Sequence, residues 1–239
     1  MNKKDFTILV QGPLNKVSLE AIADYQKICD VVVSYWENDP LEAELPQDVI
    51  KVTAPLPDRN KTVGVLKDST FYWAIKGINN GLKQVKTEYI VRTRSDERFE
   101  DLEYLMELAE STDKLVCGNI FVRSWKDVRY HIGDHVYCCK TKDLLNATES
   151  LLQQWDGESV LMDWALQERY CAEQILAHAY LVARGSEFPD WDNKLNFEKH
   201  FYVFDIAELG EYVVRWGFMN TVWNSNFVNH HGVTTMEDI

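Results

Sequence analysis

Short apolar runs alternate with helical repeats of apolar residues through the first half of the chain. Runs rich in valine, isoleucine and aromatic residues predict β-strands at residues 6–10, 31–36, 49–52 and 88–93. Apolar residues at helical spacing predict helices over residues 18–28 and over the segment with Phe71, Ile75, Ile78 and Leu82. A succession of strands and helices is typical of an α/β fold, in which a mostly parallel, twisted sheet is flanked by helices.

The second half continues with helical patterns and shorter strand candidates. Helices are predicted around Leu102, Leu105, Met106 and Ala109, from about residue 142, and around Ala172, Ile175, Leu176 and Ala179, ending near Gly185. Strands are predicted at residues 115–122 and 135–139. Residues 188–239 are rich in Trp, Phe and Asn but weakly periodic, and we predict no element there. Because the chain shows no internal repeat and no linker, we expect a single domain over residues 1–239.

Composition narrows the class of protein. With 46% hydrophobic and 26% charged residues, the chain has the balance of a globular protein. The net charge of -13 opposes binding to nucleic acid or to anionic lipid. No apolar run approaches the roughly 20 residues that span a bilayer, and the start of the chain leads into a strand pattern rather than a signal-peptide core. We therefore expect a cytoplasmic protein without a transmembrane segment.

The five cysteines give no sign of a disulfide framework or of zinc-type spacing. Their number is odd, and the adjacent Cys138 and Cys139 would point to opposite faces of a strand. We expect reduced, mostly buried thiols.

A cluster of charges directly follows the strand predicted at residues 88–93. Arg92, Arg94, Asp96 and Glu97 stand within six residues. In an open α/β sheet, ligands bind beyond the carboxyl ends of the strands, where an aspartate can hold a divalent cation and arginines can bind phosphate. The alternative is a solvated turn whose charges pair with one another.

Three further polar loops follow predicted strands, at residues 11–14, 37–40 and 58–61. If the strands are parallel, these loops and the charged cluster gather at one edge of the sheet. Backbone amides at Gly12, a carboxylate at Glu37 for a ribose or base, and the polar side chains of residues 59–61 would then form a nucleotide-binding crevice. The candidate binding residues are Gln11, Gly12, Pro13, Glu37, Arg59, Asn60, Arg92, Arg94, Ser95 and Asp96.

Five segments, at residues 8–14, 33–37, 92–96, 131–135 and 172–174, resemble in that order the WavE-like lipopolysaccharide-synthesis proteins. The resemblance extends from about Phe6 to about Leu181. It implies a glycosyltransferase of the GT-A type, with a Rossmann-like nucleotide-sugar-binding half in residues 1–100 and an acceptor half with a C-terminal elaboration in residues 101–239. It also implies a nucleotide-diphosphate sugar as donor, a glycan or lipopolysaccharide-type acceptor, and usually Mn²⁺ or Mg²⁺.

The metal motif of such enzymes is commonly Asp-x-Asp after the central strand, and Arg94 stands here at its first position. We expect Asp96 to hold the ion without a second carboxylate, because Mg²⁺ and Mn²⁺ keep several waters and accept pyrophosphate oxygens as ligands. His231, next to His230 near the C-terminus, is the candidate second ligand, unless these residues form a frayed tail. We interpret a literal Asp-x-Asp at residues 190–192 as a coincidence in a loop.

Sugar transfer also needs a base for the acceptor hydroxyl, and Asp134 and Glu173 are the candidates. Glu173 lies one step from an apolar helical stripe and could face a cleft, or it could be a solvated helix residue. We interpret His131 and His135 as hydrogen-bonded residues that steady the loop around Asp134.

Three other functions are compatible with parts of the pattern. A sugar nucleotidyltransferase would need a glycine-rich loop with a lysine where Gln11, Gly12 and Pro13 stand. A catalytically silent carbohydrate-binding or scaffold protein would explain the missing first acid of the metal motif. Sugar transfer to a base of DNA is opposed by the acidic composition.

Overall fold

A seven-stranded sheet forms the centre of the molecule. The computed structural model describes residues 1–55, 70–120, 122–156, 171–186, 193–216 and 221–224. The sheet has the order β3-β2-β1-β4-β7-β6-β8. Its strands are β1 (Phe6–Gln11), β2 (Asp30–Trp36), β3 (Ile50–Ala54), β4 (Tyr89–Arg94), β6 (Leu115–Gly118), β7 (Val136–Lys140) and β8 (Phe201–Phe204). Within this described sheet β7 alone is antiparallel to both of its neighbours, so the predicted mostly parallel sheet is confirmed.

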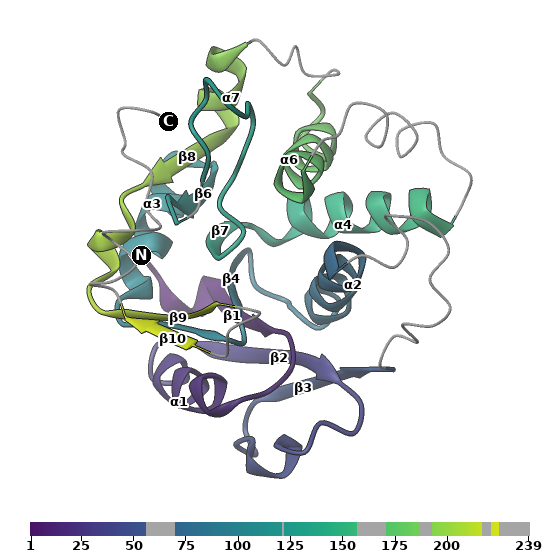
Figure 1. The fold of residues 1–239 in the computed structure, drawn as a ribbon, viewed down its shortest axis with the longest axis vertical. Helices are drawn as coiled ribbons and strands as arrows, with labels where there is room; N and C mark the ends of the chain where they lie inside the picture. The colour runs from purple at the N-terminus through teal and green to yellow at the C-terminus, as the bar shows by residue number, and fades with distance from the viewer. Residues whose placement is uncertain (56–69, 121, 157–170, 187–192, 217–220, 225–239) are drawn as a thin grey trace.

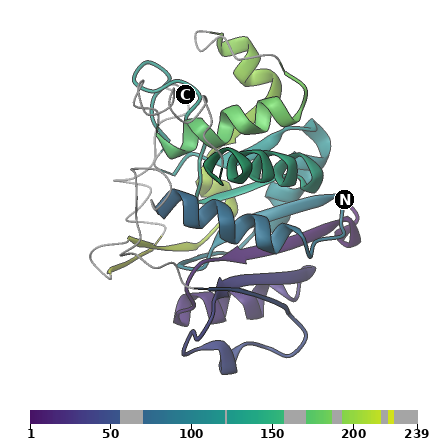
Figure 2. The ribbon, with the colours of Figure 1, turned by 90° about the vertical axis from the view of Figure 1, so that its right-hand side faces the viewer.

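Helices cover both faces of the sheet, as predicted (Figures 1 and 2). The α-helices are α1 (Lys16–Tyr25), α2 (Thr70–Leu82), α3 (Leu102–Thr112), α4 (Thr141–Asp156), α6 (Ala172–Ala183) and α7 (Lys194–His200). Short 3₁₀ helices are η1 (Lys3–Asp5), η2 (Glu42–Glu44) and η4 (Ile206–Leu209). One apolar core lies between the sheet and α1, α3 and η4, and a second lies between the sheet and α2, α4, α6 and α7.

The two cores follow from the alternation of side chains along each strand. Ile8 and Val10 of β1 belong to the α1 side, and Leu9 between them belongs to the α2 side. Cys138 and Cys139 divide in the same way, which confirms their predicted opposite orientation. All five cysteines are free thiols.

A second, antiparallel sheet lies beside the first and has the order β10-β9-β5. It consists of β5 (Glu97–Phe99), β9 (Tyr212–Trp216) and β10 (Thr221–Asn224). The chain passes from β4 to β5 through only two residues, Ser95 and Asp96. The charged cluster therefore occupies the junction between the two sheets.

The predicted elements of the first half are confirmed, with shifts at their ends. The helix predicted from residue 18 begins at Lys16, because Asn15 and Ser18 form a reciprocal capping box. The strand predicted at residues 115–122 ends at Gly118. The elements α7, β8, β9 and β10 were not predicted, because apolar residues recur only weakly along residues 188–239.

The main sheet draws on both predicted halves, since β7, β6 and β8 extend the sheet formed by β1 to β4. The assignment of a donor half and an acceptor half stays a prediction. Among the described helices, none has both the length and the apolar character that crossing a membrane requires.

Candidate functional site at the carboxyl ends of β1 and β4

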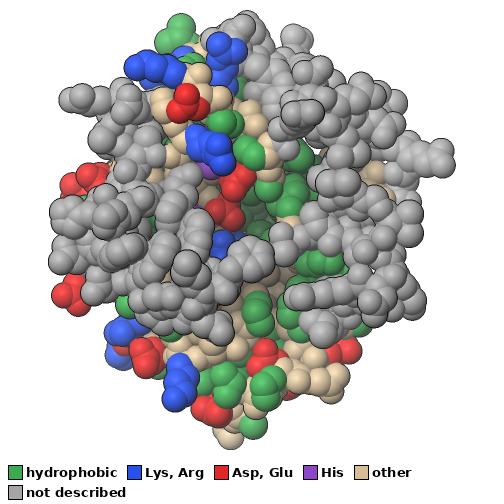
Figure 3. All heavy atoms as spheres, in the orientation of Figure 1, with side chains coloured by type: hydrophobic (Ala, Val, Ile, Leu, Met, Phe, Trp, Pro, Cys, Tyr) green, Lys and Arg blue, Asp and Glu red, His purple; other side chains and the backbone are tan. Residues whose placement is uncertain are grey.

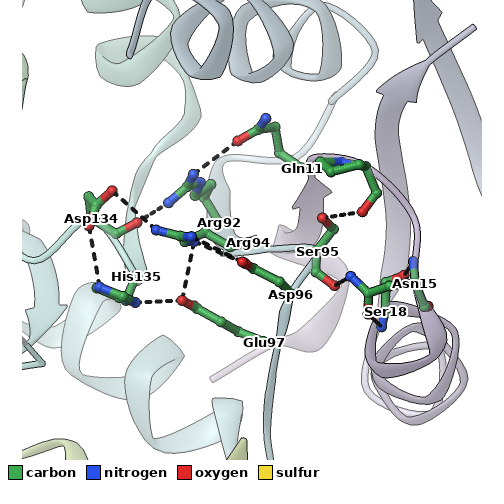
Figure 4. A network of polar contacts seen from close by, with 11 residues as sticks. Gln11, Asn15, Ser18, Arg92, Arg94, Ser95, Asp96, Glu97, Asp134 and His135 are labelled. Atoms are coloured by element: carbon green, nitrogen blue, oxygen red, sulfur yellow. Dashed lines mark hydrogen bonds and ion pairs between the residues drawn. The ribbon is translucent and has the colours of Figure 1, made fainter. Parts of the chain in front are cut away.

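The loops after β1 and β4 are bonded to each other through Ser95 (Figure 4). Its backbone N–H donates to the carbonyl oxygen of Gln11 at 2.9 Å, and its hydroxyl donates to the carbonyl oxygen of Pro13 at 2.7 Å. The side-chain amide of Asn15 in turn donates to the carbonyl oxygen of Ser95 at 3.1 Å. The predicted convergence of these two loops at one edge of the sheet is therefore confirmed.

Gly12 lies in the loop after β1, against Ser95, and has a backbone conformation that favours glycine. Its φ is +132°, and a Cβ atom at this position would lie 2.5 Å from the Oγ atom of Ser95. A side chain would both strain the backbone and force the two loops apart.

Arg92 connects three segments from inside the protein. Its guanidinium group donates to Oε1 of Gln11 at 2.9 Å and to the carbonyl oxygen of Asp134, and it lies 5.5 Å from the centroid of the Tyr137 ring. The residue is only 3% exposed. Arg92 therefore bonds to Gln11 and to the segment before β7, and little of its surface is open to solvent. Its contact with a phosphate stays a prediction.

Arg94 is the more accessible of the two arginines, with 31% of its side chain exposed. Its Nε and one terminal nitrogen donate to the two carboxylate oxygens of Asp96 at 3.0 and 3.1 Å. Nε also lies 3.3 Å from Glu97, and a terminal nitrogen lies 4.0 Å from Asp134. Burial disfavours the charge, but the three carboxylates outweigh it and raise the pKa of Arg94.

A chain of charged groups, which we call the Glu97–His135–Asp134 chain, runs from the buried interior to the surface (Figure 4). Oε1 of the fully buried Glu97 lies 2.5 Å from Nδ1 of His135. Nε2 of His135 lies 3.7 Å from Oδ1 of Asp134, whose side chain is 39% exposed. The carboxylate of Asp134 is thus the exposed end of this chain.

The three pKa shifts agree with this arrangement. Burial raises the pKa of Glu97, although the neighbouring His135 and Arg94 oppose that rise. Burial alone would lower the pKa of His135, but the two carboxylates outweigh it and raise it. Desolvation would raise the pKa of Asp134, but His135 and the two arginines lower it. Asp134 is therefore an anion at neutral pH.

Glu97 and His135 were not predicted as site residues. Glu97 does belong to the charged cluster that the sequence shows. Nothing in the local pattern, however, indicates that β7 lies beside β4, and that pairing places His135 next to Glu97.

In this conformation the carboxylate of Asp96 is paired with an arginine. Both of its oxygens accept hydrogen bonds from Arg94, and Glu97 is engaged by His135 and Arg94. The positive charges of Arg94 and His135 thus already compensate the negative charges of Asp96 and Glu97. The second predicted ligand, His231, lies outside the described residues. The metal site at Asp96 stays a prediction.

Glu173 lies in a separate group of side chains at the start of α6. Its Oε2 atom is 3.8 Å from Nε2 of His131. Ligand atoms of His131, Cys171 and Glu173 all lie within 4.8 Å of one another. Burial lowers the pKa of His131 despite the neighbouring Glu173, and burial raises the pKa of Cys171 to about 12. We call this group the His131–Cys171–Glu173 cluster.

The segment at residues 131–135 carries His131 of the cluster and both Asp134 and His135 of the charged chain, and it packs closely against β6. The N–H of Gly133 donates to the sulfur of Cys117 at 3.3 Å. A Cβ atom at Gly133 would lie 2.3 Å from the carbonyl oxygen of Gly118. This close approach to β6 fixes the positions of His131 and Asp134.

The other predicted residues are less closely associated with the cluster. Glu37 follows β2 at the same edge of the sheet, and its side chain is exposed. Among the described residues, no contact joins that side chain to Arg94 or Asp96. Asp39 of the same loop accepts a hydrogen bond from the N–H of Leu14 at 2.8 Å, so the loop after β2 does contact the loop after β1. Arg59, Asn60 and residues 190–192 lie outside the described part of the chain.

Figure 3 shows acidic and basic side chains in the middle of one face of the molecule, next to an apolar surface. Charged side chains are therefore exposed on this face.

Comparison with protein families gives a match over most of the chain. Residues 6–202 match the profile of a family described as WavE lipopolysaccharide synthesis, which confirms the resemblance of the five segments. No curated protein matches the chain.

Two solved structures show weaker similarity. The crystal structure of HddC from Yersinia pseudotuberculosis has 12% identity and a TM-score of 0.38, over 59% of this chain and 78% of that chain. The same protein complexed with GMP-PN has 13% identity and a TM-score of 0.37, over 59% of this chain and 79% of that chain. Similarity at this level carries no inference about function.

Proposed function

Because the chain belongs to the WavE lipopolysaccharide synthesis family, we propose that it is a glycosyltransferase with a GT-A-type fold. It moves a sugar from a nucleotide-diphosphate sugar to a hydroxyl group of a lipopolysaccharide-type glycan. One observation carries the proposal: a partly exposed arginine, Arg94, and a partly exposed carboxylate, Asp134, lie together beyond the carboxyl end of β4. That edge of a parallel sheet is where such folds bind nucleotides.

The donor binds with its diphosphate toward Arg94. Gly12 lets the loop after β1 lie directly against Ser95, since a Cβ atom there would be 2.5 Å from the Oγ atom of Ser95, and the backbone of this loop faces the diphosphate. In the free protein, the carboxylates of Asp96, Glu97 and Asp134 compensate the charge of Arg94. A bound diphosphate replaces part of these contacts with its own oxygens, which form charge-assisted hydrogen bonds to the guanidinium group.

Asp134 acts as the base for the acceptor. Its oxygens lie 4.0 Å from Arg94 and 3.7 Å from His135, beyond hydrogen-bonding distance, so they remain available to a sugar hydroxyl. The carboxylate takes the hydroxyl proton while the acceptor oxygen bonds to the anomeric carbon. The bond from that carbon to the diphosphate breaks, its electron pair leaves with the diphosphate, and Arg94 balances the resulting charge.

A divalent ion, Mn²⁺ or Mg²⁺, stays a proposal supported by the family resemblance. When bound, such an ion would supply positive charge at the diphosphate. Because the carboxylate of Asp96 is bound by Arg94, no catalytic step is assigned to the ion.

The experiment is an assay of nucleoside diphosphate release from a panel of nucleotide sugars, with a lipopolysaccharide core acceptor, in EDTA and in Mn²⁺. We expect acceptor-dependent release of nucleoside diphosphate from one donor. Release of pyrophosphate from a nucleoside triphosphate and a sugar phosphate would show a nucleotidyltransferase instead. A donor that raises the melting temperature but is never cleaved would show a binding protein.

A further inference from the structure

Beyond sugar transfer, we propose that the His131–Cys171–Glu173 cluster is a binding site for one zinc-type transition-metal ion. This site is distinct from the predicted metal site at Asp96. It offers one nitrogen, one sulfur and one oxygen donor from two segments of the chain.

The distances suit a single ion. Nε2 of His131 and Oε2 of Glu173 are 3.8 Å apart, and all three ligand atoms lie within 4.8 Å of one another. Zinc bonds of about 2.0–2.3 Å in tetrahedral geometry place ligand atoms roughly 3.3–3.6 Å apart. The imidazole and the carboxylate are within about half an ångström of this spacing, and the thiol sulfur lies within 4.8 Å of both.

The two ligand-bearing segments are joined by Gln174. Its Oε1 accepts the backbone N–H of Cys171 at 3.1 Å, and its side-chain amide donates to the carbonyl oxygen of Arg129 at 2.8 Å. Arg129 stands two residues before His131. The first turn of α6 is thus bonded to the loop segment that carries His131. The three ligands are therefore held together without the ion.

The donor set selects the class of metal. A thiolate with an imidazole and a carboxylate suits Zn²⁺ better than Mg²⁺ or Mn²⁺, which prefer oxygen ligands. Three protein ligands leave a fourth position for water, as in open zinc sites. Glu173 is 24% exposed and Cys171 is partly exposed, so an ion can reach the site from solvent.

When the ion binds, one proton is released and two contacts between protein groups are exchanged for bonds to the ion. The Cys171 thiol loses its proton to solvent as the sulfur bonds to the metal. It gives up its 3.3 Å hydrogen bond to Oε1 of Gln174, and that oxygen keeps the backbone N–H of Cys171. Glu173 exchanges its contact with His131 for a shared bond to the ion.

The test is metal binding by the full chain, measured by equilibrium dialysis with Zn²⁺ and by the absorption spectrum with Co²⁺. We expect one ion per chain and a thiolate-to-cobalt charge-transfer band. Cys171→Ser should abolish the band, and both His131→Ala and Glu173→Gln should weaken binding at least about tenfold. Cys29→Ser is the matched control, since Cys29 is also a partly exposed free thiol, and it should bind as the wild type does.

Wild-type binding no tighter than that of the Cys171→Ser variant, or a Co²⁺ spectrum without a thiolate band, would overturn the site. Circular dichroism identifies any variant that fails to fold, and a wild-type Co²⁺ spectrum without a thiolate band rejects the site whatever the variants show. This binding test does not depend on turnover. A chain that binds zinc but transfers no sugar in the separate assay would therefore refute the proposed function and leave this site in place.

Discussion

Nδ1 of His135 lies 2.5 Å from Oε1 of Glu97, and both side chains are buried. The contact joins the residue just before β7 to β5, and the two residues are 38 positions apart in the chain. It places the adjacent Asp134 beside Arg94, where the proposed chemistry takes place.

This contact predicts a pH-dependent contribution to stability. The folded protein raises the pKa of His135 above its ordinary value of 6.5. The stabilisation is therefore fully present below pH 6.5 and is lost as pH rises through the raised pKa. We expect the difference in unfolding free energy between wild type and His135→Gln to shrink as pH rises above 6.5, as measured by denaturant titration.

The matched control is His178→Gln, because burial lowers the pKa of His178. The contribution of His178 to the free energy of unfolding depends on pH in the opposite direction. It is present above pH 6.5 and is lost as pH falls through the lowered pKa. Each variant is compared with wild type at the same pH. Burial also lowers the pKa values of His131 and His200, and the difference in unfolding free energy cancels their contribution. A wild-type advantage over His135→Gln that grows with pH would contradict the pairing with Glu97.

Asp134→Asn should lower turnover by about 10²–10⁴-fold and leave donor affinity within a few-fold of wild type, because the base acts on the acceptor. The measurement is kcat with saturating donor and acceptor, together with the dissociation constant of the donor. Asp48→Asn, at an exposed aspartate before β3, is the control and should be as active as wild type. Equal losses of turnover and donor affinity would place Asp134 in the nucleotide pocket.

Arg94→Lys should weaken binding of the nucleoside diphosphate by roughly tenfold to a hundredfold, since charge-assisted hydrogen bonds contribute about 1.5–3 kcal/mol and lysine lacks the guanidinium fork. Isothermal titration calorimetry in EDTA and in Mn²⁺ measures the effect. Arg98→Lys is the control, because Arg98 is also a partly exposed arginine paired with an aspartate, Asp24. Unchanged affinity in Arg94→Lys under both conditions would remove Arg94 from the diphosphate site.

Gly12→Ala should destabilise the protein by about 1–3 kcal/mol through backbone strain, with a further cost from the contact with Ser95. Gly185→Ala separates the two effects, because Gly185 has a φ of +73° and open space around its Cβ position. A double variant Gly12→Ala, Ser95→Ala should recover part of the loss, since it removes the Oγ atom that lies 2.5 Å away. If Gly12→Ala is no less stable than Gly185→Ala, the close approach of the two loops is wrong.

Much of the site's scaffold was readable from the sequence. The strands at β1, β2 and β4 have apolar runs long enough to identify, and parallel strands bring the loops that follow them to one edge. The pattern of strands and loops alone predicts that Gln11, Gly12, Ser95 and Asp96 lie together. This prediction rests on local periodicity and on a general rule of sheet topology.

The tertiary structure alone decided how the charges in this site are partnered. The antiparallel pairing of β7 with β4 brings Asp134 and His135 to Arg94 and Glu97, and it encloses Arg92 in the interior. The same folding sets Glu173 beside His131 rather than in the charged cluster. Strand pairing between distant segments depends on packing across the whole sheet, and the period of apolar residues within one segment carries no information about it.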